Sequence, residues 1–136
     1  PFALRGSTMR FPQERNDHLV NLLTIARFDP SSENRAAVQE ELLRGRALLI
    51  VQARPVPGDP RSLEFLHAPV LDGRPTLFAF TSEVALRSWS TQDMELVIVP
   101  AGAFFQGCLK NGIGTVVVDA STPNELRIAL GRSAAA

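Results

Sequence analysis

The residues best suited to chemistry in this chain are few and far apart in the sequence. His18, His67 and Cys108 are the only histidines and the only cysteine. Zinc sites usually include at least one closely spaced ligand pair, and these three residues form none. A nucleophilic cysteine needs a lowered pKa and a nearby base, whereas Cys108 shares a helical face with Phe104 and Phe105. We therefore expect structural histidines, a buried thiol, no metal site and no cofactor.

The sequence patterns that mark common catalytic sites are missing. There is no Gly-x-Ser-x-Gly elbow, no Gly-x-Gly-x-x-Gly fingerprint and no Walker loop. The paired carboxylates Glu40 and Glu41 are expected on a solvated helix face, where acid–base chemistry is not favoured. We expect no catalytic residues. An enzyme with a dispersed site is the alternative, because catalytic groups converge in space and not in sequence.

The Phe80-Thr81-Ser82 segment is the more promising candidate for a binding site. It joins an apolar run to a helical pattern, so one hydroxyl can cap the helix while the other points outward. Arg74 and Trp89 would then form the walls of a small polar and aromatic pocket. In the structural interpretation, which we favour, both hydroxyls serve the cap and Trp89 anchors the core. The binding hypothesis names Arg74, Thr81, Ser82 and Trp89 as ligand- or partner-binding residues.

Apolar residues at three- and four-residue spacing predict the helices that position these groups. The first stripe runs from Leu19 to Ala26 and stops at Asp29-Pro30, since the residue before proline disfavours helical geometry. Gly45 and Asn111-Gly112 mark two further helix ends. The predicted helices begin at Asn16 or Asp17, at Ser31, Ser32 or Asn34, at Thr81 or Ser82, and shortly before Phe104.

The segment after residue 120 carries two conflicting signals. Thr122-Pro123-Asn124-Glu125 has the capping-box pattern with proline at the first helical position, which predicts a short helix. Leu126, Ile128 and Leu130 alternate with the two-residue period of a strand. We predict the helix here.

Short apolar runs between turn signals predict the strands. Residues 54–61 contain three prolines, so we expect a surface loop there. The Asp72-Gly73 turn predicts an antiparallel pair between 62–68 and 76–80. The fold class is α/β, one small domain with a mixed sheet of about five strands and parallel pairing where helices separate the later strands. The central strands are expected at 47–52, 76–80, 95–99 and 114–118.

Composition excludes several classes of protein. Fourteen basic residues balance fourteen acidic ones, so no positive excess exists for a dedicated nucleic-acid binder. No apolar run is long enough to span a membrane, and the first residues lack the apolar core of a signal peptide. A single cysteine suits a reducing compartment. We therefore expect a cytoplasmic protein that binds neither nucleic acid nor membrane.

The segment from Leu71 to Trp89 carries a family resemblance. Its Asp-Gly turn, its apolar strand ending Phe80-Thr81-Ser82 and its helix with Leu86 and Trp89 resemble the N-terminal domain of the SseB-like family, named for enhanced serine sensitivity. The resemblance covers about residues 16–120. It implies a small α/β domain over 16–132, between an arm at 1–15 and a tail at 133–136, and it implies no known activity.

The resemblance also has one departure. The family usually follows its last strand with Asn-Pro, whereas this chain has Asp119-Ala120, so we expect a different turn.

We expect a non-catalytic module that binds a protein partner or a small metabolite. Besides the enzyme with a dispersed site, a domain of a longer chain is an alternative, suggested by the absence of an initiating methionine. We also expect a homodimer, because mixed sheets leave strand edges open and the neutral chain resists association weakly. Strand 62–68 is the expected edge.

Overall fold

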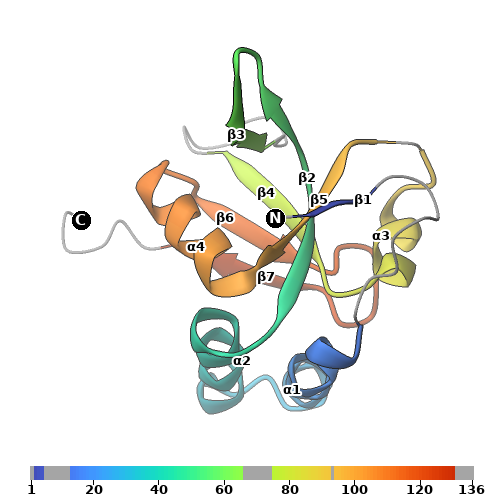
Figure 1. Cartoon of the computed structure of the whole chain (residues 1–136). Coiled ribbons are helices and arrows are strands. Elements are labelled where there is room, and N and C mark those ends of the chain that lie inside the picture. Colours follow the sequence, from blue (N-terminus) through green and yellow to red (C-terminus); the bar gives the residue numbers. More distant parts are fainter. Residues whose placement is uncertain (1, 5–12, 66–74, 93, 131–136) are drawn as a thin grey trace.

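The computed structural model describes residues 2–4, 13–65, 75–92 and 94–130 (Figure 1). In this part of the chain, the helices pack around one sheet. The helical segments are η1 (Gln13–Asn16), α1 (Asp17–Phe28), α2 (Ser32–Arg44), α3 (Glu83–Trp89) and α4 (Ala101–Lys110). The strands are β1 (Phe2–Leu4), β2 (Leu48–Val56), β3 (Asp59–Phe65), β4 (Thr76–Phe80), β5 (Leu96–Pro100), β6 (Thr115–Val118) and β7 (Leu126–Ala129).

The strands follow the order β1-β5-β2-β4-β6-β7. The strand β3 is not part of this order and pairs with β2. The pair β4–β6 is parallel, and the other described pairs are antiparallel. The predicted α/β class with a mixed sheet is confirmed, and the four strands expected to be central are the inner four. Parallel pairing is confirmed for β4 and β6, but β5 lies on the other side of β2 and runs antiparallel to it.

Each face of the sheet has its own core because successive side chains of a strand point to opposite faces. Leu49 and Val51 join the larger core under α1, α2 and α4, whereas Ile50 joins a smaller core under α3. Cys108 lies in the larger core, as predicted. None of the helices described is long and apolar enough to cross a membrane.

The predicted surface loop over 54–61 is wrong, because β2 and β3 form a hairpin that extends beyond the rest of the sheet (Figure 1). Gly58 has φ +83°, a conformation that glycine adopts without strain, and it closes the turn. Each proline lacks a backbone N–H and so removes one possible ladder hydrogen bond. A two-stranded hairpin tolerates this loss because an N–H on its open edge would have no strand partner. The register shifts between Pro55 and Val56, which marks a β-bulge or similar irregularity in the hairpin.

The predicted pairing of 62–68 with 76–80 is also wrong. In the described residues β3 pairs with β2, and β4 pairs with β2 and β6. The Asp72-Gly73 turn on which the prediction rested lies outside the described residues. Within the expected arm, Phe2–Leu4 forms β1 along β5.

The predicted short helix after Thr122 is wrong because the period-two signal prevails. Leu126–Ala129 forms β7, antiparallel to β6. Ile128 is buried in the larger core, and Leu126 and Leu130 pack against it. Placing alternate side chains on this core requires a strand, and the capping-box residues form the turn before it.

Candidate functional site

The carboxyl ends of the parallel strands β4 and β6 bring two polar residues together. Thr81 directly follows β4, and Asp119 directly follows β6. The Thr81 N–H donates to Asp119 Oδ1 at 2.8 Å, and Thr81 Oγ1 donates to Oδ2 at 2.6 Å. The two residues are only 2% and 4% exposed. Both carboxylate oxygens are therefore held by one residue at the floor of the site.

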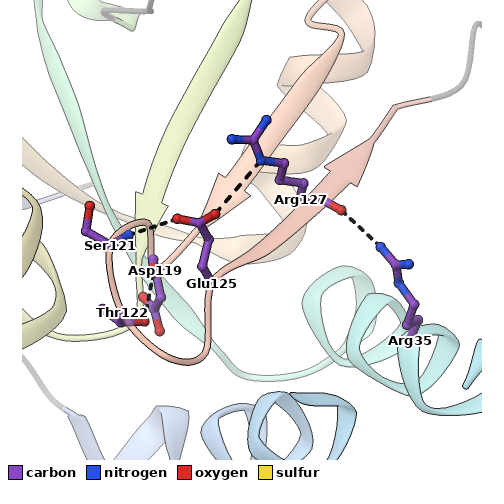
Figure 2. A network of polar contacts seen from close by, with 6 residues as sticks. All are labelled: Arg35, Asp119, Ser121, Thr122, Glu125 and Arg127. Atoms are coloured by element: carbon purple, nitrogen blue, oxygen red, sulfur yellow. Dashed lines mark hydrogen bonds and ion pairs between the residues drawn. The ribbon is translucent and has the colours of Figure 1, made fainter. Parts of the chain in front are cut away.

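Asp119 also shapes the turn toward β7. It has φ +54°, in the left-handed region that aspartate and asparagine tolerate better than most residues. Its carbonyl oxygen accepts hydrogen bonds from Thr122 N–H at 3.2 Å and Thr122 Oγ1 at 2.7 Å. Glu125 reaches back to the N–H of Ser121 at 2.9 Å, which closes the turn (Figure 2). Burial raises the pKa of Asp119 above its ordinary value, and the hydrogen bonds from Thr81 partly oppose that rise.

Asn16 secures the start of α1 beside this floor. It occupies the N-cap position, at the predicted start of the helix, but its side chain makes no cap hydrogen bond. Its Nδ2 donates to the carbonyl oxygens of Leu48 at 2.7 Å and Thr81 at 2.8 Å. Its Oδ1 accepts from the Leu48 N–H at 2.8 Å. One buried amide thus joins α1 to the start of β2 and to the end of β4.

A groove of about 700 Å³ opens above this floor, between α1, α3 and the turn after β6. Half of its lining side chains carry hydroxyl or amide groups, and Asp17 and Arg27 add charge. Val20, Val84 and Pro123 supply apolar surface. The hydrogen-bonding side chains of the lining are Asn21, Thr24, Thr81, Ser82, Ser88, Thr122 and Asn124.

The structure separates the four residues of the binding hypothesis. Thr81 and Ser82 line the groove, and Ser82 caps α3 because its Oγ accepts the Ala85 N–H at 3.0 Å. Trp89 is not among the groove residues. Its ring lies 5.2 Å from that of Phe78, centroid to centroid, and packs with the smaller core. Arg74 lies outside the described residues.

Among the described residues, neither His18 nor Cys108 lines the groove. His18 is exposed and its Nε2 lies 3.8 Å from Glu41 Oε1 on α2. Burial raises the pKa of the Cys108 thiol to about 12, so the thiolate nucleophile is suppressed. His67 lies outside the described residues. No three histidine, cysteine, aspartate or glutamate side chains gather to form a metal site in the described ranges.

Sequence reasoning missed Asp119, Asn124 and Thr24 as groove residues. Asp119 carried a usable signal, since a polar residue directly after an apolar parallel strand lies at the ligand-binding edge of such sheets. Asn124 donates from Nδ2 to Thr24 Oγ1 at 3.2 Å, across 100 positions of sequence. A contact of that range leaves no local pattern.

Replacing Ser82 with alanine is expected to lower the free energy of unfolding by about 1 kcal/mol, the usual cost of losing a side-chain cap. The matched control is Ser88→Ala on the same helix, because Ser88 Oγ only donates back to the Val84 carbonyl. That control is expected to change stability by less than about 0.5 kcal/mol. Urea unfolding of both variants measures the difference, and equal losses would contradict the cap.

Comparison with known proteins assigns most of the chain to one family. Residues 19–130 match the family described as SseB protein N-terminal domain. Searches of curated proteins and of solved structures gave no match. The family match covers well over half of the sequence, from the first turn of α1 through β7, and leaves out β1 and η1. The chain therefore belongs to the SseB N-terminal domain family.

Proposed function

We propose that this domain is a non-catalytic module that binds a small polar metabolite in the groove between α1 and α3. The observation that carries the proposal is the groove itself, at the carboxyl ends of β4 and β6. Open α/β sheets bind ligands at that edge. A volume of about 700 Å³ also lies within the usual range of ligand pockets.

The lining of the groove favours a ligand rich in hydroxyl or amide groups. Asn21, Thr24 and Asn124 provide both donors and acceptors along its wall. Asp17 and Arg27 stand ten positions apart on α1, which corresponds to about 15 Å along a helix. A free amino acid is too short to pair with both charges at once. An elongated polar molecule, or a smaller one held by the central amides, fits better.

Asp119 favours a second candidate function, an enzyme with a dispersed site. It is a buried titratable group at the groove with a raised pKa, which is a frequent property of catalytic acids. Its two oxygens, however, already accept hydrogen bonds from Thr81. General acid–base work requires an oxygen that can exchange a proton with substrate. Binding is therefore the better-supported function, with Asp119 as a structural group.

A cytoplasmic location is part of this proposal. The single cysteine and its buried thiol are compatible with a reducing compartment. The balanced charge supports a partner other than nucleic acid.

A thermal-shift screen against polar metabolites, with serine, other amino acids, sugars and nucleosides included, tests the proposal. A ligand present at about one hundred times its Kd is expected to stabilise the fold by ~2.7 kcal/mol, which raises the melting temperature by several degrees.

This rise in melting temperature should disappear in Asn21→Ala combined with Ser88→Ala, which removes two groove side chains. The control Gln106→Ala, on the exposed side of α4, should keep it. A shift of equal size in all variants would place the ligand elsewhere, and no shift with any compound would refute a metabolite site.

A further inference from the structure

β7 is the last strand of the sheet, and in the described part of the chain it pairs with β6 alone. Antiparallel neighbours alternate between pairs that exchange main-chain hydrogen bonds and pairs that do not. The Leu130 N–H donates to the Gly114 carbonyl at 2.9 Å, which fixes this alternation. The N–H and C=O groups of Arg127 and Ala129 therefore point away from β6. They form an edge to which another extended chain can add.

Three arginines from three different elements surround the start of this edge. Arg27 of α1, Arg35 of α2 and Arg127 of β7 line a groove of about 380 Å³. Arg35 Nη2 approaches the outward carbonyl of Arg127 at 3.5 Å (Figure 2). Glu125 is the one carboxylate in the lining, and it already accepts the Ser121 N–H and lies 3.9 Å from Arg127. This groove is positive although the whole chain is neutral.

The other end of the edge is apolar. Leu43 of α2 and Leu109 of α4 are 45% and 47% exposed, and they flank a groove of about 110 Å³ with Ile128 and Leu130. The strand thus runs from a positive groove to an apolar one. Exposed apolar side chains beside an open strand edge are typical of a peptide-binding surface.

We propose that β7 is the docking strand for an extended acidic segment of a partner protein. The segment adds to the sheet through the outward main-chain groups of Arg127 and Ala129. Its carboxylates pair with Arg35 and Arg127, and an apolar side chain fills the groove at Leu43. This surface is separate from the floor formed by Thr81 and Asp119, and it requires no metabolite.

Charge complementarity favours this occupant over a second copy of the chain. Two copies related by a twofold axis would pair their β7 strands antiparallel. The arginine end of one strand would then face the apolar end of the other, which leaves both grooves mismatched. An acidic segment with apolar residues matches both.

Fluorescence anisotropy tests the proposal with two labelled peptides, one of four glutamates followed by four valines and one of the reverse order, one for each strand direction. Both orders are needed because side chains of an extended segment alternate between faces, and the acidic and apolar residues must lie at opposite ends. The control peptides carry Lys in place of Glu. We expect one of the acidic peptides to bind and neither basic peptide to bind. Arg35→Glu combined with Arg127→Glu should weaken binding by about tenfold or more. The matched control is Arg44→Glu with Arg87→Glu, two exposed arginines that line neither groove and give the same change in net charge. That control should keep the affinity within about twofold, because remote exposed charges contribute little.

Ala129→Pro separates strand addition from simple charge attraction. Proline removes the outward N–H of residue 129 and leaves the bonds to β6 in place, so the melting temperature should hold while peptide binding is lost. Peptide binding that survives Ala129→Pro, or full competition by inorganic phosphate, would reduce the surface to a general anion site and overturn the proposal. Absence of binding at millimolar peptide would overturn it as well. A dimer in sedimentation that Ala129→Pro dissociates would assign the edge to a second copy instead.

Discussion

Replacing Asn16 with alanine is expected to lower the free energy of unfolding by about 3–4 kcal/mol, because each buried group left without its partner costs about 1–3 kcal/mol. The Asn16 side chain is 1% exposed and completes hydrogen bonds to the Leu48 N–H, the Leu48 carbonyl and the Thr81 carbonyl. Alanine provides none of the three. Urea unfolding monitored by circular dichroism measures the loss.

Asn16→Asp separates the lost hydrogen bonds from a simple loss of volume. Aspartate has nearly the same shape, but at neutral pH it turns an oxygen toward the two carbonyls that now accept from Nδ2. We expect it to be at least as destabilising as alanine at pH 7 and to recover part of the loss in acid, where the protonated carboxyl donates one bond. The control is Asn21→Ala, an exposed position of α1, which should cost less than about 0.5 kcal/mol. Equal effects at both positions would show that Asn16 has no special role.

The sequence predicted the inner strands because each is a short apolar run whose burial decides its structure. Residues 48–51 and 115–118 are rich in valine, leucine and isoleucine, and they form β2 and β6 with both faces covered. The first helix was predicted for a similar reason, since Leu19 and Leu23 recur at helical spacing and are buried. These signals are local, so tertiary contacts only reinforce them.

The sequence misled where local and distant preferences compete. Thr122-Pro123-Asn124-Glu125 favours a helix start locally, but burying Leu126 and Ile128 beside β6 requires a strand. The prolines of the β2–β3 hairpin argued for a loop, whereas Gly58 supplies a tight turn. Burial and strand pairing outweigh local propensity in β7, and strand pairing does so in the hairpin.

The candidate site was only partly predictable because its contacts span the chain. Thr81 and Ser82 were identified from their position after a strand. Their partners could not be identified, since Asn16 reaches Thr81 across 65 positions and Asp119 reaches it across 38. Trp89 was a pocket wall only in the binding hypothesis, and it packs against Phe78 in the smaller core, as the favoured structural interpretation predicted.

Asp119→Ala is expected to cost about 3 kcal/mol, by two effects. It strips the acceptors from the buried Thr81 N–H and hydroxyl, and it places alanine at φ +54°, where side chains other than asparagine and aspartate are strained. Asp119→Asn should cost less than about 1 kcal/mol at neutral pH. Its amide oxygen can accept the Thr81 N–H, its NH₂ can donate to the Thr81 hydroxyl, and asparagine tolerates the backbone angle. Urea unfolding measures both variants.

The pH dependence of the Asp119→Asn variant tests the raised pKa directly. Because burial raises the pKa of Asp119 above 3.8 in the folded state, the folded protein holds this proton more tightly than the unfolded chain does. The contribution of Asp119 to stability is therefore greatest below the unfolded pKa, and it falls as pH rises from there through the folded pKa. Asparagine has no such titration.

The free energy of unfolding of Asp119→Asn relative to the parent should therefore increase with pH over that window and level off above it. A difference that stays constant across the window would show that Asp119 titrates alike in both states, and one that falls with rising pH would mean that the hydrogen bonds from Thr81 outweigh burial.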